Sequence, residues 1–221
     1  MTSPIGRKLW TGVTGLVWVL FVIVHMVGNL GYFVSGEAYN LYSNFLLSTG
    51  PLIYTVEFLL VVTILIHVVI GIDIYRKKRI ARKRGYERYR SAGAPSLMSV
   101  SSRSMIYTGL ILLVFLVIHL GTFKFGPGLD AGYVATVGTD QIRDLKRLVT
   151  ETFQSPLYAF GYPAVMILLG IHLRHGIWSA FQSLGAMNER LTPIVYLVGT
   201  LAAIGIAVGF LVLPLYIFFF A

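Results

Sequence analysis

The chain has 221 residues, of which 56% are hydrophobic and 12% are charged, and its mean hydropathy is +0.76. This composition excludes an ordinary soluble domain and indicates a membrane protein. The net charge of +9 does not call for a nucleic-acid partner, because membrane proteins collect Lys and Arg on their cytoplasmic side. The chain has no cysteine, which excludes disulfides, thiolate zinc sites, iron–sulfur clusters and cysteine nucleophiles within it.

Five apolar segments are long enough to cross about 30 Å of hydrocarbon. Because lipid tolerates no unsatisfied backbone, all five should be helices. The predicted fold is therefore all-α, an integral membrane bundle of five transmembrane helices that forms a single domain over residues 1–221. In chain order, the helices are expected near residues 9–34, 53–75, 105–123, 157–181 and 193–219. In the longest connection, DQIRDLKRLVTETF predicts a short amphipathic element.

The distribution of basic residues predicts the orientation. The connection RKKRIARKRGYERYR holds nine Lys and Arg residues between Arg76 and Arg90, whereas residues 35–52 hold none. The positive-inside rule then predicts a multi-pass protein of the cell membrane, with the N-terminus in the cytoplasm and the C-terminus outside. The basic run sets the topology in this interpretation, and docking of a soluble partner or of anionic lipid is an alternative role.

All five histidines fall inside predicted helices, where ionisable residues are rare and functional by default. At 1.5 Å per residue from the cytoplasmic ends, His25 and His119 lie roughly 24 and 21 Å deep. His67 and His172 lie roughly 12 and 13 Å deep, so that two levels form about 10 Å apart. Each level joins imidazoles from two helices, which is expected of two stacked bis-histidine haems.

Two further features bear on the fourth predicted helix. His67 and His172 share the spacing H-x-x-x-G, and glycine allows a flat macrocycle to approach the backbone. His175 is then left over, and we interpret it as a hydrogen-bonded histidine beside the inner haem, with a zinc site as the weaker alternative. Arg174 is expected to pair with Asp73 or to contact a haem propionate.

The segments HMVGNL, GPLIYTVEFLLVVTILIHVVIGI and HLRHGIWSAFQSLG resemble the two-haem cytochrome b membrane anchors of succinate dehydrogenases and fumarate reductases. The resemblance covers almost the whole chain. It implies two haem b groups, an outer one between His25 and His119 and an inner one between His67 and His172.

The same resemblance implies cytoplasmic partners, an iron–sulfur subunit and a flavoprotein that oxidises succinate. Electrons would pass through the inner and outer haems to menaquinone or another quinone. The chain would be the membrane subunit of a succinate:quinone oxidoreductase, respiratory complex II of the tricarboxylic acid cycle, in a bacterial plasma membrane. It would have no succinate site and no catalytic residue of its own. The direction of the reaction, the type of quinone and the oligomeric state stay open.

Residues around the two haems are candidates for further roles. Those for quinone binding near the outer haem are Asn29, Glu37, Tyr42 and Glu57. Those for the inner face and the propionates are Arg7, Arg103 and His175. A glutamate that some relatives use for proton movement is replaced here by Gly170, which argues against that pathway.

Two other functions are compatible with the pattern. One is a di-haem cytochrome b of a different redox complex. The other is a transporter that relays protons through histidines and Asp73 or Glu57. The transporter is disfavoured because the sequence has no inverted repeats or broken helices, and its halves do not match.

Overall fold

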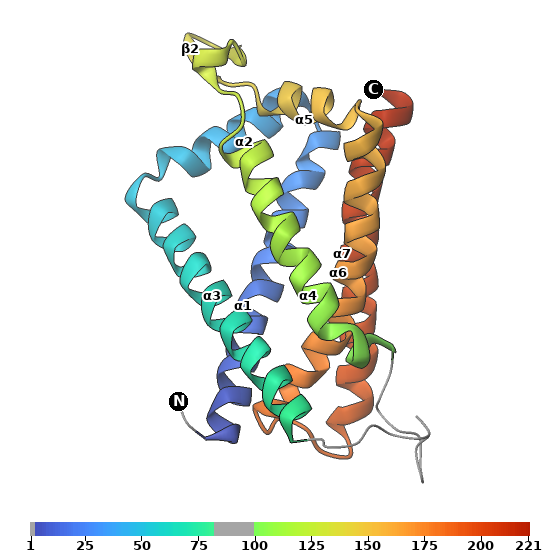
Figure 1. The fold of residues 1–221 in the computed structure, drawn as a ribbon. Coiled ribbons are helices and arrows are strands. Elements are labelled where there is room, and N and C mark those ends of the chain that lie inside the picture. Colours follow the sequence, from blue (N-terminus) through green and yellow to red (C-terminus); the bar gives the residue numbers. More distant parts are fainter. Residues whose placement is uncertain (1–2, 82–99) are drawn as a thin grey trace.

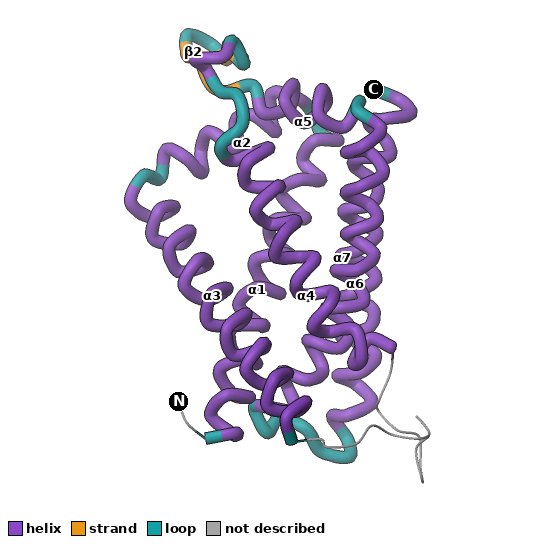
Figure 2. The backbone as a smooth tube through the Cα atoms, viewed as in Figure 1, coloured by secondary structure: helices purple, strands orange, loops and turns teal. Residues whose placement is uncertain are grey.

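The computed structural model describes residues 3–81 and 100–221, which are almost entirely helical (Figure 1, Figure 2). Among these residues, five helical segments are long and apolar enough to span a membrane, as predicted. The spans are Pro4–Phe33, Pro51–Ile80, Ser101–Lys124, Pro156–Ser183 and Leu191–Phe220. Several extend beyond the apolar stretches, and the first begins five residues earlier than expected.

The elements follow one another in a simple order. They are α1 (Pro4–Leu30), the 3-10 turn η1 (Gly31–Phe33), α2 (Gly36–Ser48), α3 (Pro51–Ile80), α4 (Val100–His119), the π-helical turn η2 (Leu120–Lys124), the 3-10 turn η3 (Leu129–Ala131), β1 (Val134–Val137), β2 (Asp140–Arg143), α5 (Leu145–Phe153), α6 (Pro156–Ser183) and α7 (Leu191–Phe220).

Local signals explain where three of the long helices begin. Ser3 caps α1 by accepting a hydrogen bond from the backbone N–H of Gly6 at 3.0 Å. Pro4, Pro51 and Pro156 stand at the starts of α1, α3 and α6. Proline suits this position because its φ is already helical and its missing N–H would have no partner there.

The long helices form a bundle whose two termini lie at opposite ends, as an odd number of spans requires (Figure 1). α7 runs along α6, and small residues let the two helices approach closely. A Cβ on Gly170 would lie 3.0 Å from Cβ of Ala207. α3 leans away from the rest of the bundle toward the end that carries α2 (Figure 1).

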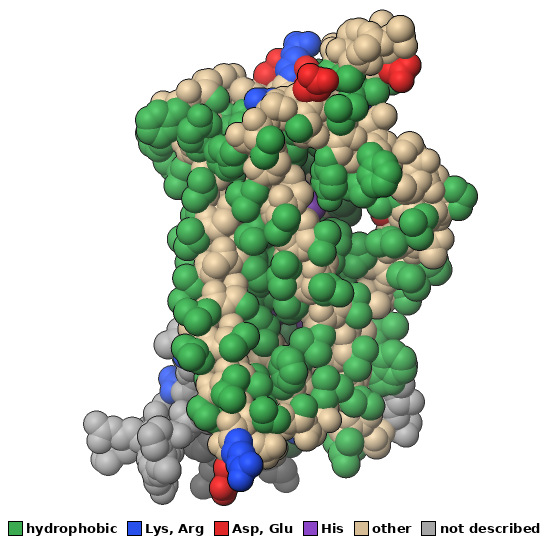
Figure 3. Space-filling model, turned by 180° about the vertical axis from the view of Figure 1, so that it is seen from behind, with side chains coloured by type: hydrophobic (Ala, Val, Ile, Leu, Met, Phe, Trp, Pro, Cys, Tyr) green, Lys and Arg blue, Asp and Glu red, His purple; other side chains and the backbone are tan. Residues whose placement is uncertain are grey.

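The outer surface is suited to lipid. Apolar side chains cover the middle of the molecule, and charged side chains gather at its two ends (Figure 3). Val69, Val117 and Leu197 are examples of large apolar side chains that are exposed. Exposed apolar surface on this scale indicates burial in a bilayer rather than contact with water.

The connections contain more structure than the sequence predicted. α2 fills the first connection and is capped by Ser35, which accepts from the N–H of Ala38 at 2.9 Å. In the long connection, the expected amphipathic segment is divided between β2 and α5, and Asp144 caps α5. β1 pairs with β2 in an antiparallel hairpin. The prediction of an all-α fold is therefore corrected by one short hairpin, outside the spans.

The predicted basic run is described only in part. Its first five residues, 76–80, end α3, and residues 82–90 lie outside the described residues. The orientation of the bundle in a membrane stays a prediction.

Candidate functional site

A cavity of about 1570 Å³ runs through the bundle and is lined mainly by apolar residues of α1, α2, α3, α4, α6 and α7. It exceeds the roughly 300–1,000 Å³ of ordinary ligand pockets. All five histidines of the chain line it. Histidine atoms are visible through openings in the apolar wall (Figure 3).

His25 of α1 and His119 of α4 form the outer pair. Their ring centroids are 5.6 Å apart and the ring planes are nearly perpendicular, at 89°. Imidazoles that face one another from two helices in this way could together hold one haem.

Aromatic rings hold the outer imidazoles. Phe21 stacks on His25 at 5.4 Å, and Phe115 stacks on His119 at 5.7 Å. In each case the phenylalanine lies four residues earlier, one turn along the same helix, where side chains meet face to face. The stacking restricts rotation of both imidazoles.

Polar contacts of the outer pair are unequal. Nε2 of His25 lies 3.3 Å from the side-chain amide nitrogen of Asn29. Tyr39 in turn donates to the amide oxygen of Asn29 at 3.0 Å. Nδ1 of His119 is buried and has no hydrogen-bond partner among the described residues. A buried nitrogen without a partner is costly and needs an explanation, such as a bound group that is not part of the chain.

His67 of α3 and His172 of α6 are the two histidines of the inner level, and both line the cavity. Nδ1 of His67 lies 3.2 Å from Oγ1 of Thr14 on α1. Nδ1 of His172 lies 3.0 Å from Oγ1 of Thr108 on α4. Each inner histidine is thus held by a threonine from a neighbouring helix.

A glycine follows each of these threonines and makes room for the imidazole. A Cβ on Gly15 would lie 3.2 Å from Cε1 of His67, and a Cβ on Gly109 would lie 3.3 Å from Cε1 of His172. Both distances are tighter than ordinary van der Waals contact. The two inner rings therefore depend on the absence of a side chain at these positions.

The two levels are further apart than the sequence suggested. Thr14 precedes His25 by eleven residues, and Thr108 precedes His119 by eleven. Eleven residues rise about 16 Å along a helix axis. The expected separation of about 10 Å was therefore too small.

The repeated contacts correspond to a repeated sequence. The pattern T-G-L-x4-F-x3-H occurs at residues 14–25 and again at 108–119. The pattern P-L-x13-I-H-x3-G-I occurs at 51–72 and again at 156–177. The first four spans thus contain two copies of one two-helix unit in the same order, which corrects the statement that the halves do not match. Thr14 and Thr108 were missed, and this repeat is the signal that could have found them.

The second glycine of each unit is open to the cavity. Gly71 and Gly176 both line it, and a Cβ on either would meet nothing within 4 Å. Glycine at such a position lets a flat group lie against the backbone. With the apolar lining, these glycines fit a porphyrin in the cavity.

His175 lines the cavity apart from the two pairs. Its ring lies 5.7 Å from that of Trp178, and it is within electrostatic range of Arg174 and Lys78. The described residues contain no group of three or more His, Cys, Asp or Glu that could hold a metal ion, so that the zinc alternative gains no support.

The inner end of the cavity is rich in cations. Arg7 forms an ion pair with Asp73 at 3.4 Å, and Lys77 forms another with the same carboxylate at 2.9 Å. Asp73 is thus paired with these two residues, where the sequence analysis expected Arg174. Arg7 and Asp73 lie outside the lining of the cavity, whereas Arg103 is part of it.

The four quinone candidates do not all lie together. Asn29, Tyr42 and Glu57 line the cavity. Glu57 also forms an ion pair with Lys124 at the end of η2. Glu37 is exposed in the first turn of α2 and lines a separate shallow pocket with residues of α5.

A cap closes the end of the bundle next to the outer pair. α5 contributes Val149 and Phe153 to an apolar cluster, whose other buried members are Tyr32, Tyr39, Tyr162, Leu213 and Ile217. Burial raises the pKa of Tyr39 above its ordinary value, so that the phenol stays protonated.

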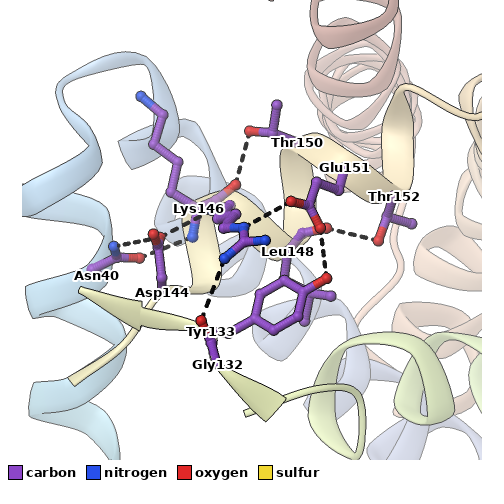
Figure 4. Close-up of polar contacts among 10 residues, drawn as sticks. Asn40, Gly132, Tyr133, Asp144, Lys146, Leu148, Thr150, Glu151 and Thr152 are labelled. Atoms are coloured by element: carbon purple, nitrogen blue, oxygen red, sulfur yellow. Dashed lines mark hydrogen bonds and ion pairs between the residues drawn. The ribbon is translucent and has the colours of Figure 1, made fainter. Parts of the chain in front are cut away.

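Polar contacts fasten the cap above this cluster (Figure 4). Asn40 of α2 donates to Asp144 at 2.8 Å and accepts from the N–H of Lys146 at 2.9 Å. The side chain of Lys146 reaches over the ring of Tyr32, 4.7 Å from its centre. α2 and α5 are thereby tied together across the outer end.

Comparisons of the chain with models of protein families, with curated proteins and with solved structures found no match. The interpretation of the site therefore rests on its residues and their geometry.

Proposed function

We propose that the chain is the di-haem cytochrome b membrane anchor of a succinate dehydrogenase. The observation that carries the proposal is the arrangement of four imidazoles along one apolar cavity, where the rings of His25 and His119 lie 5.6 Å apart. The four histidines come from two copies of one sequence unit. Bundles build cofactor sites from side chains on facing helices, and imidazole is a suitable axial ligand for haem iron.

In this proposal, His25 and His119 hold an outer haem b, and His67 and His172 hold an inner one. Haem supplies reversible one-electron oxidation and reduction when it is bound. The chain's own residues orient the axial imidazoles and exclude water. Gly71 and Gly176 leave the backbone accessible, and the cation Arg103, which lines the inner end, suits a propionate. Arg7 is paired with Asp73 instead.

A quinone site in the outer half of the cavity is part of the proposal. α2 and α3 line this part with apolar residues such as Leu46 and Val56, which suit a quinone ring and tail. The Tyr42 hydroxyl can donate a hydrogen bond, whereas the amide nitrogen of Asn29 is directed at His25. Glu57 supplies a carboxylate that can hold or pass a proton. The exposed position of Glu37 leaves it without a role here.

The proposed partners are an iron–sulfur subunit and its flavoprotein, docked at the inner end. Basic residues in the last turn of α3, which include Lys77 and Arg79, support an acidic partner by charge complementarity. The assignment to succinate, rather than to another donor, depends on the resemblance of the sequence to the succinate dehydrogenase anchors. The chain itself would transfer electrons and would not oxidise succinate.

Spectroscopy of the purified protein and of native membranes tests the proposal. We expect two haem b groups per chain and their reduction when succinate is added to native membranes. A protein without haem would instead favour a proton-coupled transporter. A protein with haem that succinate does not reduce would be a cytochrome of a different redox complex.

A further inference from the structure

We infer that Thr14 and Thr108 are positioning residues, which fix the inner imidazoles in the tautomer that presents Nε2 to the haem iron. The role toward iron rests on the proposed function. The tautomer itself is a property of this chain, with or without a cofactor. Each threonine differs from the apolar residues of the cavity, because its hydroxyl contacts an imidazole on a neighbouring helix.

The proton of each threonine hydroxyl already takes part in a hydrogen bond within its own helix. Thr14 donates to the backbone carbonyl of Trp10 at 2.7 Å. A threonine hydroxyl has one proton, and its oxygen retains lone pairs that accept. The contact of 3.2 Å with His67 therefore requires Nδ1 of that imidazole to be the donor.

Thr108 repeats the arrangement on α4. Its hydroxyl lies 3.1 Å from the carbonyl of Ser104 and 3.2 Å from that of Met105, so that its proton is shared between two acceptors of its own helix. Nδ1 of His172, at 3.0 Å, is again left to donate.

Burial protects these two hydrogen bonds from replacement by water. Thr14 is 1% exposed and Thr108 is 3% exposed, so that water has no room to replace either partner. A neutral imidazole with its proton on Nδ1 carries its lone pair on Nε2. In metal sites, the partner of the second nitrogen fixes the tautomer and the ring orientation in this way.

Among the described residues, the outer histidines, His25 and His119, have no threonine contact of this kind at Nδ1. Nδ1 of His119 has no partner among the described residues, and the side-chain contact of His25 is between Nε2 and Asn29. Loss of a threonine hydroxyl should therefore affect the inner haem alone. This selectivity separates a positioning role from a general loss of packing.

The experiment compares valine and serine at both positions in the full chain. Thr14→Val and Thr108→Val keep the branched shape and remove the hydroxyl, whereas Thr14→Ser and Thr108→Ser keep the hydroxyl. Thr55→Val is the matched control, because the Thr55 hydroxyl donates to a carbonyl of its own helix and the side chain is exposed. The first measurement is the ¹⁵N NMR spectrum of histidine-labelled protein without haem. The second is the retention of each haem in the loaded protein.

We expect wild type and both serine variants to show protonated Nδ1 at His67 and His172. Each valine variant should lose that signature at one histidine and should bind the inner haem about 10- to 100-fold more weakly, as is typical when such a partner is removed. The outer haem and the Thr55→Val control should be unchanged.

Three results would overturn the inference. They are protonated Nε2 at these histidines in the wild type, valine variants that match the control in both measurements, and weakening of both haems to the same extent. A chain with the expected tautomers that binds no haem overturns the positioning role together with the proposed function. If haem binds and the valine variants behave as expected but succinate does not reduce it, only the proposed function fails.

Discussion

Glu57 on α3 forms an ion pair with Lys124, the last residue of the π-helical turn that follows His119. Both residues line the cavity, so that the pair joins α3 to α4 beside the outer imidazoles. π-Helical turns are rare and are frequent at functional sites. The turn brings a lysine from the end of one span to a carboxylate on another.

The first prediction concerns this carboxylate. Glu57→Gln keeps the shape of the side chain but cannot hold the proton that quinone reduction requires. We expect quinone reduction to fall by about 100-fold, within the usual contribution of a general acid or base, with haem content unchanged. Glu37→Gln is the control, because Glu37 is exposed and lies away from the cavity. Normal quinone reduction in Glu57→Gln, or an equal loss in the control, would exclude this role.

The second prediction assigns the axial ligands. Alanine at His25, His67, His119 or His172 should remove or perturb one haem, because each imidazole is one half of a pair. His175→Ala should keep both haems, since His175 belongs to neither pair. Haem content and low-temperature spectra of the purified variants distinguish the two groups. Loss of haem in His175→Ala, with retention in one of the others, would mean that the pairing is wrong.

The third prediction tests the space beside the inner imidazoles. Gly15→Ala and Gly109→Ala add a methyl group 3.2 and 3.3 Å from Cε1 of His67 and His172, so that each ring must shift. We expect a shifted spectrum of the inner haem and an unchanged spectrum of the outer one. Gly205→Ala on α7 is the control, because its Cβ would meet nothing within 4 Å. Identical spectra in all three variants would show that the contact does not constrain the ring.

The spans were predictable because long apolar runs have few alternatives in a membrane, but their ends were not. α1 begins at Pro4 because Ser3 and Pro4 form a helix start. A count of apolar residues placed the start later, because Arg7 and Lys8 are charged. α2 was missed because a short interfacial helix lacks the apolar length of a span. Its capping serine, Ser35, was the local signal that could have indicated it.

The contacts of Thr14 and Thr108 with the inner histidines were not predicted, for a different reason. Threonine in a membrane helix usually bonds to its own backbone, as Thr55 does. Only the tertiary structure brings Thr14 to a histidine 53 residues away. Depth along the helices grouped His25 with His119, and their rings lie 5.6 Å apart in the structure. The hydrogen-bond partners of each imidazole depend on how neighbouring helices are rotated, which periodicity does not reveal.

The fourth prediction concerns the pH dependence of the outer cap. Tyr133 and Arg147 bond to Glu151 and hold the pKa of that carboxyl below its ordinary value of 4.5. A depressed pKa stabilises the fold above the ordinary value, and this contribution is lost as the pH falls through the folded-state pKa. Proteolysis of the hairpin should therefore accelerate below about pH 4.5. The rate in Glu151→Gln should already be raised at neutral pH and should change less on acidification. A wild-type rate that is constant across this range would contradict the prediction.

The fifth prediction links the cap to the outer haem. Asn40 is 4% exposed, and its amide makes both contacts that join α2 to the start of α5 (Figure 4). Asn40→Ala leaves the part-buried N–H of Lys146 without its side-chain partner, at a cost of about 1–3 kcal/mol. Hydrogen exchange in α5 should become faster.

Because Phe153 and Tyr162 of the same cluster pack near His119, the outer haem should also be lost at a lower temperature while the inner haem is retained. Glu37→Gln, on the same face of the molecule but exposed, should leave both measurements at the wild-type value. Equal loss of both haems in Asn40→Ala would mean that the substitution weakens the whole bundle. Unchanged exchange in α5 would mean that the apolar cluster alone holds the cap in place.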